Sequence, residues 1–319
     1  MRFTIVGCGA LGTILGAHLL QAGHVVNVRV RGARKTQIEA NGLRVKGLRN
    51  ISGSGRGSLT INRPVQKDIL VYAVKTYQFE HAFSDVGNCN PRAVFSLANG
   101  VEKTRLLKNL YPESSVLGCM ANFSGELGSD GVANFTRNVA VYIGGLSTHV
   151  RSIAATMNTA GINTIYSDNI ETEEWSKFVG WAALLVTSVI ARTDTGATLA
   201  NPYLAQIAAT IIYESSLIAS KQGVTLIDRA PFPVATISAA SLEDATGEVI
   251  KIGEDFTREA PGHRMSAVQD LSFGRELEVE ETLGFLCKEA ISLGLDCPCL
   301  QMSYNIVSGV NHIQKSLKN

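Results

Sequence analysis

Three glycines lie close together near the start of the chain, in the run GCGALG. They follow the apolar run Phe3–Val6 and precede an amphipathic stretch, so the pattern is GxGxxG between a predicted strand and a predicted helix. In that setting the first glycine permits a tight turn, the second lets a pyrophosphate approach the backbone, and the third lets helix and strand pack closely. A plain glycine turn is the alternative. The run predicts a dinucleotide site on the helix N-terminus, formed by Gly7, Cys8, Gly9, Ala10, Leu11 and Gly12.

The end of the next predicted strand indicates which dinucleotide binds. Sites that prefer NAD carry an acidic residue there, which accepts a hydrogen bond from the ribose 2′-OH. Here the run VVNVRVRG ends at Arg29 and Arg31, and Arg34 and Lys35 follow. Guanidinium groups suit a 2′-phosphate, although Arg34 and Lys35 could equally form a solvated basic loop. The sequence therefore predicts NADPH or NADP as the cofactor, with Arg31 on the 2′-phosphate.

A lysine precedes the most apolar stretch of the chain. Lys177 is followed by Phe178–Ile190, which is almost wholly apolar and predicts a buried helix with Lys177 near its start. The positive helix end and partial desolvation both disfavour an ammonium, which lets a lysine release a proton near neutral pH. The alternative is an ordinary lysine at the N-terminal end of the helix, with a buried aliphatic stem and a solvated ammonium.

An acidic residue lies in a mixed stripe of apolar and polar residues in the second half of the chain. Glu278 belongs to positions spaced three and four residues apart, which predicts one helix face: Val268, Leu271, Arg275, Glu278, Thr282 and Phe285. A buried carboxylate needs a partner, and both Arg275 and Lys177 are candidates. The acidic neighbours Glu276, Glu280 and Glu281 fit an ordinary solvated face. The run Ser266-Ala-Val-Gln269 reads as a capping box, with Ser266 as the N-cap.

Five separated motifs resemble the ketopantoate reductase (2-dehydropantoate 2-reductase) family over nearly the whole chain. They are GCGALG, AVKTYQ, LANGVE, EEWSKF and HRMSAVQDLSFGRELEVEETLG. The resemblance implies a Rossmann-type domain, a helical second domain and a substrate cleft between them. It also implies that NADPH reduces the keto group of 2-dehydropantoate to give pantoate, a step of pantothenate and coenzyme A biosynthesis.

The resemblance also implies roles for individual residues. Cofactor contacts fall on Arg31, Lys75, Gln78 and Asn99, and the last three follow predicted strands at the usual ligand edge of an α/β sheet. Lys177 is implied as the donor of a proton to the carbonyl oxygen. Glu278 is implied to bind the substrate hydroxyl and help hold the lysine. Ser266 and His263 are implied to hold the substrate.

The chain departs from the family pattern after the lysine. Where the family commonly has asparagines four and eight residues on, this chain has Trp181 and Leu185, and a further polar substrate position is Thr195. The change removes up to four hydrogen-bonding groups, a loss of roughly a few kcal/mol for a substrate that needs them. A more apolar 2-keto acid therefore stays open as the substrate. A non-catalytic NADP(H)-binding sensor module also stays open.

The order of elements predicts two domains that would position these residues. Strands expected at 3–6, 25–30, 69–74, 93–97 and 115–120 alternate with helices at 12–21 and 103–111, which is typical of a parallel sheet. Strands at 139–143 and 164–166 would close this part. Long helices are expected at 170–191, 201–222 and 266–293. We thus expect an α/β fold, with an NADP-binding Rossmann-like domain at 1–168 and an all-helical substrate domain at 169–319.

Composition narrows the classes of partner. The formal net charge is +1 and charged residues are 18% of the chain, which favours neither nucleic acid nor a membrane surface. No apolar run reaches the roughly 18 residues of a membrane span. The six cysteines are scattered and give no metal-ligand spacing. The expectations are a cytoplasmic enzyme with a small-molecule 2-keto acid substrate and no metal. A homodimer stays open, because the Ala/Ile-rich helices suit either a domain core or a dimer face.

Overall fold

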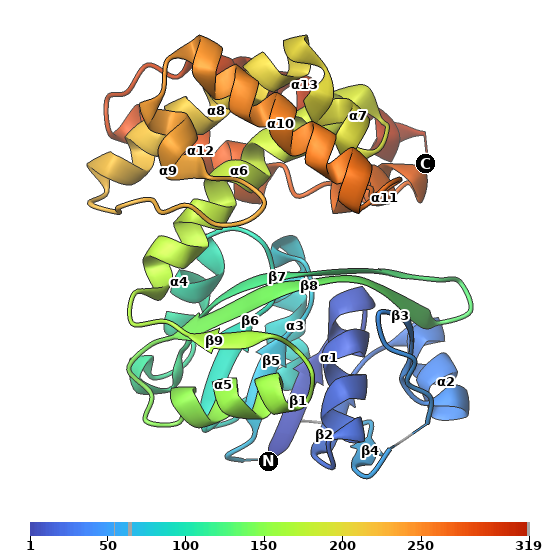
Figure 1. The fold of residues 1–319 in the computed structure, drawn as a ribbon. Coiled ribbons are helices and arrows are strands. Elements are labelled where there is room, and N and C mark those ends of the chain that lie inside the picture. The colour runs from blue at the N-terminus through green and yellow to red at the C-terminus, as the bar shows by residue number, and fades with distance from the viewer. Residues whose placement is uncertain (54, 63–65, 318–319) are drawn as a thin grey trace. The chain divides into compact units, whose positions relative to one another are not determined.

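A computed structural model describes residues 1–53, 55–62 and 66–317, and the chain forms two compact units, Met1–Glu171 and Thr172–Asn319. The elements of the first unit are α-helices and strands, which Figure 1 labels, and two short 3-10 helices, η1 and η2. In chain order they are β1 (Arg2–Val6), α1 (Ala10–Gln21), β2 (Val25–Arg29), α2 (Gly32–Asn41), β3 (Arg44–Gly47), β4 (Ser58–Thr60), β5 (Ile69–Tyr72), η1 (Thr76–Gln78), α3 (Phe79–Val86), β6 (Ala93–Ser96), α4 (Glu102–Lys108), η2 (Glu113–Ser115), β7 (Gly118–Leu127), β8 (Val132–Gly144), α5 (Val150–Thr159) and β9 (Thr164–Tyr166).

The first sheet is parallel throughout, in the order β4-β2-β1-β5-β6. Side chains of a strand alternate between the two faces, and here both faces are buried. Ile5 belongs to the core cluster that includes α1, whereas Val6 belongs to the cluster that includes α3 and α4. Apolar runs with no polar alternation are what a parallel sheet covered on both faces requires. The structure confirms the predicted α/β fold with an N-terminal Rossmann-type parallel sheet.

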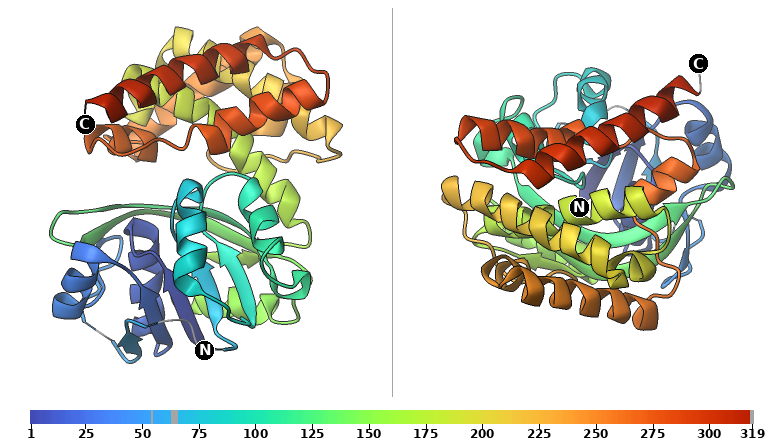
Figure 2. Two further views of the ribbon diagram at one scale, coloured as in Figure 1. Left: turned by 180° about the vertical axis from the view of Figure 1, so that it is seen from behind. Right: turned by 90° about the horizontal axis from the view of Figure 1, so that it is seen from above.

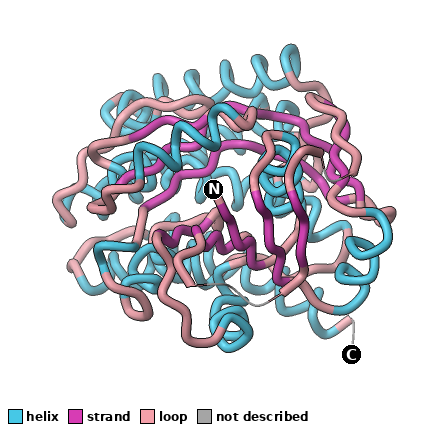
Figure 3. The backbone as a smooth tube through the Cα atoms, turned by 90° about the horizontal axis from the view of Figure 1, so that it is seen from below, coloured by secondary structure: helices cyan, strands magenta, loops and turns pink. Residues whose placement is uncertain are grey.

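A second sheet has the order β3-β8-β7, with β9 paired to β8. Strands of both sheets are magenta in Figure 3. β7 and β8 are antiparallel and form a long hairpin. The strand predicted at 115–120 corresponds to β7, which begins later, at Gly118. Helix α1 contacts strands of both sheets. At Gly125 of β7 an added Cβ would lie 2.8 Å from the Asn134 carbonyl oxygen of β8 and 2.5 Å from Ile14 Cδ1 of α1, so the close approach to the β8 backbone favours glycine here.

The described residues of the second unit form helices joined by loops. They are α6 (Ile170–Ala191, which begins in the last residues of the first unit), α7 (Thr195–Ala200), α8 (Pro202–Lys221), α9 (Val234–Ala239), α10 (Leu242–Glu259), α11 (Ser266–Ser272), the π-helical turn η3 (Glu280–Gly284), α12 (Phe285–Ser292) and α13 (Pro298–Ser316). Helix α8 lies between α10 and α13 (Figure 2, right). Among the described residues, no helix has the length and apolarity needed to cross a bilayer.

The predicted helix over 266–293 is wrong, because the chain leaves the helical conformation after Ser272. Gly274 adopts a φ of +62°, and a glycine in this left-handed conformation commonly ends a helix. The Arg275 amide then bonds to the Asp270 carbonyl at 2.7 Å. Helix resumes only at the π-helical turn from Glu280. The expected helical stripe through Val268 and Glu278 therefore does not exist.

Candidate functional site

The glycine turn between β1 and α1 has an open side. An added Cβ at Gly7, whose φ is +88°, would lie 2.4 Å from Val74 Cγ1, and one at Gly12 would lie 2.2 Å from the Gly7 oxygen. At Gly9 an added Cβ would meet nothing within 4 Å. The fold thus needs glycine at positions 7 and 12 but not at 9, where the open space adjoins the first amides of α1. Backbone amides at such a turn suit a pyrophosphate.

The side chain of Cys8 takes no part in chemistry at this turn. Cys8 is buried, and burial raises the pKa of its thiol to about 12. Because the thiolate is the reactive form, Cys8 contributes its backbone only.

Arg34 is hydrogen-bonded to the glycine turn and is not part of a solvated basic loop. Its Nε donates to the Cys8 carbonyl at 2.8 Å, and its Nη2 donates to Thr13 Oγ1 at 2.7 Å. Its Nη1 donates to the Gly131 carbonyl at 3.1 Å, in the turn between β7 and β8. Burial lowers the pKa of this guanidinium. One side chain therefore ties the glycine turn and the first turn of α1 to the hairpin.

We expect Arg34→Ala to lower the free energy of unfolding by about 2–3 kcal/mol, because hydrogen bonds from a charged group to four partners, Gln37 Oε1 among them, are lost. Affinity for adenine nucleotides falls with it, since the glycine turn loses its support. Lys35→Ala is the matched control, because Lys35 is exposed and its ion pair is with Glu39 on its own helix, at 3.7 Å. Urea denaturation and nucleotide titration of both variants measure the difference, and equal stability of the two would contradict the assignment.

A carboxylate lies beside the two arginines at the end of β2. Arg31 Nε is 3.2 Å from Asp85 Oδ2, and Arg29 Nη2 is 3.6 Å from Asp85 Oδ1. Asp85 belongs to α3, which follows a different strand of the sheet. Asp85 is far from β2 in the sequence, so no local pattern around Arg31 indicates this carboxylate.

The other predicted cofactor residues lie in two adjoining loops. Lys75 and Gln78 follow β5, and Asn99 follows the neighbouring strand β6. The Lys75 amide donates to Gln78 Oε1 at 3.3 Å, and Thr76 Oγ1 donates to the Asn99 carbonyl at 3.4 Å. Because parallel strands end at one edge of the sheet, these loops share that edge with the glycine turn.

In the second unit, Lys177 is not near a helix start. Helix α6 begins at Ile170, so Lys177 is about two turns inside it, and the dipole of a helix acts mainly within its first turn. The expected effect of the positive helix end on Lys177 is therefore wrong. The residue is half-buried, and the residues on either side of it in the sequence, Ser176 and Phe178, are buried.

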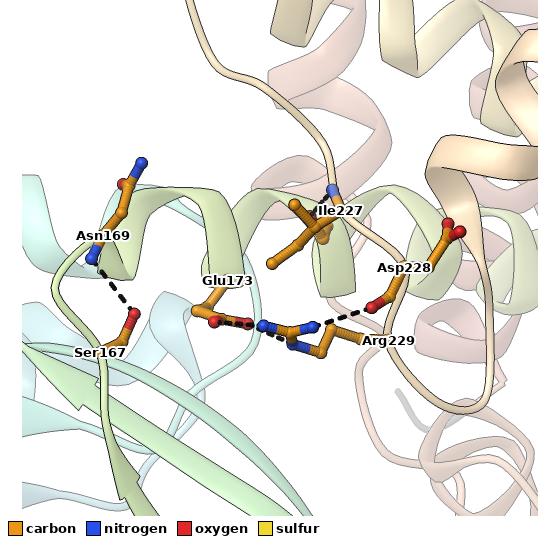
Figure 4. Close-up of polar contacts among 7 residues, drawn as sticks. Ser167, Asn169, Glu173, Ile227, Asp228 and Arg229 are labelled. Atoms are coloured by element: carbon orange, nitrogen blue, oxygen red, sulfur yellow. Dashed lines mark hydrogen bonds and ion pairs between the residues drawn. The ribbon is translucent and has the colours of Figure 1, made fainter.

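Hydrogen bonds join the loop before α9 to α6 (Figure 4). They reach the residues of α6 that come just before Lys177. Arg229 makes a bidentate pair with Glu173, with Nε–Oε2 and Nη2–Oε1 distances of 2.8 Å each. The Ile227 amide donates to Ser176 Oγ at 2.9 Å. Glu173 is one helical turn before Lys177 and Ser176 is its neighbour, so both ties fix the backbone around the lysine. These partners are distant in sequence, and no local pattern signals them.

Glu278 is buried, with 4% of its surface exposed. It lies in a non-helical segment that a bond from the Leu277 amide to Asn311 Oδ1 of α13, 3.0 Å long, holds in place. Of the two partners considered for Glu278, Arg275 pairs instead with Asp270, at 2.9 Å.

Aromatic packing joins this segment to α6. The ring of Phe285, just after the π-helical turn, lies 6.0 Å from the ring of Trp175 and 5.9 Å from that of Phe178. These two residues flank Lys177 in the sequence. The stretch that follows Glu278 therefore packs on the turn of α6 that carries the lysine.

The acidic residues around Glu278 do not all form a solvated face. Glu280 is exposed and accepts a hydrogen bond from the Tyr304 hydroxyl at 2.8 Å. Glu281 is half-buried, and burial raises the pKa of its carboxyl, with smaller contributions from Glu278, Glu276 and Glu280. Several carboxyl groups thus lie around Glu278, of which Glu276 pairs with Lys315 and Glu280 with Lys288.

Ser266 and His263 lie at the start of α11. Ser266 begins this helix instead of capping it, and Gln269 Nε2 donates to the Arg264 carbonyl at 3.1 Å, so the predicted capping box is wrong. His263 Nδ1 and Thr195 Oγ1 are hydrogen-bonded at 2.9 Å, and the Thr195 amide donates to the His263 carbonyl at 2.8 Å. The fold therefore joins two polar residues that the resemblance placed near substrate.

The two departures from the family pattern are both buried. Trp181 and Leu185 lie on α6, one and two turns beyond Lys177, with exposures of 9% and 1%. Buried apolar side chains thus stand at the two positions of α6 where the family commonly has asparagines.

Comparisons with known proteins agree along the chain. The family model "Ketopantoate reductase PanE/ApbA" matches residues 3–148, and its C-terminal counterpart matches 169–311. A 2-dehydropantoate 2-reductase of Archaeoglobus fulgidus is 29% identical over 97% of both chains, and one of Pyrococcus horikoshii is 24% identical over 93% of both. In fold, a ketopantoate reductase of Ralstonia eutropha JMP134 has a TM-score of 0.82 at 22% identity, covering 99% of this chain and 100% of its own. A D-mandelate dehydrogenase solved with NADH and anilino(oxo)acetate has the same TM-score and coverage at 19% identity.

Proposed function

Because the chain belongs to the ketopantoate reductase family, we propose that it reduces a 2-keto acid to the 2-hydroxy acid with a hydride from NADPH. The observation that carries this proposal is the open space at Gly9, beside the first amides of α1. This open space would let the pyrophosphate of a dinucleotide approach the backbone. The turn Gly7–Gly12 would hold the pyrophosphate, with Arg31 on the 2′-phosphate and Lys75, Gln78 and Asn99 along the rest of the cofactor.

We assign the proton transfer to the second unit. When bound, the nicotinamide supplies a hydride to the carbonyl carbon of the substrate. The Lys177 ammonium donates a proton to the carbonyl oxygen, and the neutral amine then regains a proton from water. Glu278 accepts a hydrogen bond from a substrate hydroxyl and orients the lysine. Ser266 and His263 hold the substrate, and the bond between His263 and Thr195 fixes the position of the imidazole.

The first candidate substrate is 2-dehydropantoate, which would place the enzyme in pantothenate biosynthesis. The name of the relatives that match the chain end to end supports it. The second candidate is a more apolar 2-keto acid. Trp181 and Leu185 favour it, because they replace polar groups with buried apolar volume, and a structural neighbour is named for mandelate.

An assay of NADPH oxidation with separate 2-keto acids tests the proposal. We expect turnover, with the highest kcat/KM for 2-dehydropantoate. A higher kcat/KM for phenylglyoxylate, the keto acid that corresponds to mandelate, would assign the second candidate. NADPH binding without turnover of any keto acid would overturn the enzymatic proposal and leave a cofactor-sensing module.

A further inference from the structure

One carboxylate lies beside the two arginines at the end of β2, of which Arg31 is the one assigned to the 2′-phosphate. Asp85 Oδ2 is 3.2 Å from Arg31 Nε, and Asp85 Oδ1 is 3.6 Å from Arg29 Nη2. The Asp85 side chain is 25% exposed and that of Arg31 is 66% exposed. The group that faces the ribose region is therefore two arginines bridged by an acid, and its net charge is lower than the local sequence VRVRG suggests.

Asp85 lies beside the end of β2, the region of such a fold where NAD and NADP are distinguished. A site for NAD uses a carboxylate near the end of the second strand to accept from the ribose 2′-OH, whereas a site for NADP uses arginine for the 2′-phosphate. Here the arginines come from the end of β2 and the carboxylate comes from α3. A 2′-phosphate bound by Arg31 would either share the guanidinium with Asp85 or displace it, because Asp85 contacts only Nε, and in both cases it would be repelled by the carboxylate. A 2′-OH meets no such penalty.

We propose that Asp85 sets the cofactor selectivity of this protein by competing with the 2′-phosphate for Arg31, so that NADH is accepted as well as NADPH. The inference rests on the proposed function, because it takes the Gly7–Gly12 turn as the nucleotide site. An exposed ion pair is weak, so Arg31 can exchange Asp85 for a phosphate. Selectivity is thus a balance of two competing anions on one guanidinium.

Binding of two small nucleotides tests the proposal without any turnover. Adenosine 2′,5′-bisphosphate and adenosine 5′-monophosphate differ only in the 2′-phosphate, and calorimetric titration gives the affinity of each. We expect Asp85→Asn to raise the affinity for the bisphosphate roughly five- to tenfold at low salt and to leave the monophosphate unchanged or weaker. The gain shrinks at high ionic strength, because exposed charges are screened.

Two further variants separate selectivity from structure. Glu80→Gln removes an exposed carboxylate from the same helix, and the ratio of the two affinities stays at its wild-type value. In an Arg31→Ala background, Asp85→Asn gives a much smaller gain, because the two side chains act on the phosphate together.

The outcomes distinguish this inference from the function on which it rests. If Asp85→Asn alters both affinities by the same factor, Asp85 is only a structural tie and the inference is wrong. If the wild-type protein binds neither nucleotide, the nucleotide site itself is wrong, and the proposed function fails with it.

Discussion

We expect Lys177→Ala to lower kcat about 10³-fold and to leave the affinity for NADPH nearly unchanged. A positioned general acid contributes about 10²–10⁴-fold to the rate, and alanine has no proton to donate to the carbonyl oxygen. Lys177 lies in the second unit, while the residues assigned to the nucleotide lie in the first, so binding survives. Steady-state kinetics with the preferred keto acid, together with fluorescence titration of NADPH, measure the two quantities separately.

Two controls accompany the Lys177 variant. Lys251→Ala removes an exposed lysine of the same unit that pairs with Glu248 at 2.6 Å, and it retains the wild-type kcat. Thermal denaturation of both variants checks that the fold is intact. Full turnover by a folded Lys177→Ala protein would remove the lysine from the mechanism.

We expect Gly9→Ala to fold normally and to bind NADPH about 10²-fold more weakly. Its added Cβ meets no protein atom within 4 Å, so stability is retained. The methyl group instead occupies the space next to the α1 amides, where the pyrophosphate must approach the backbone. Circular dichroism melts and NADPH titration of the variant give the two readouts.

Gly12→Ala is the matched comparison, because its Cβ would lie 2.2 Å from the Gly7 oxygen. Overpacking of this kind costs about 1–3 kcal/mol of stability, so Gly12→Ala melts at a lower temperature than Gly9→Ala. If Gly9→Ala binds NADPH as tightly as the wild-type protein does, the pyrophosphate does not lie at this turn.

The parts that sequence predicted well depend on neighbouring residues. The glycine spacing and the continuous apolar strands act over a few positions, so GCGALG and the strands β1, β2, β5 and β6 could be located, together with α6 to its bounds. The break after α11 also had a local signal, since Gly274 follows Ser272 and Phe273. The regular three- and four-residue spacing of apolar positions across it nevertheless favoured one continuous helix.

The parts that sequence missed depend on tertiary contacts. From sequence, Arg34 fits either a 2′-phosphate contact or a solvated basic loop, because its partners, Cys8 and Gly131, are distant in sequence. Asp85 was not weighed against Arg31 for the same reason. The pair of Arg229 with Glu173 is a third example. In each case the partner of a charged residue is far away in the sequence, and such partners cannot be deduced from periodicity.

Transfer of deuterium from NADPH labelled at C4 of the nicotinamide, in the position that the enzyme transfers, is the most direct test of the central claim. Incubation with the preferred 2-keto acid should give a 2-hydroxy acid that carries one deuterium at C2, seen by mass spectrometry, while the hydroxyl proton comes from solvent. Labelled cofactor that remains intact beside unreduced keto acid, although the protein binds both, would contradict the account.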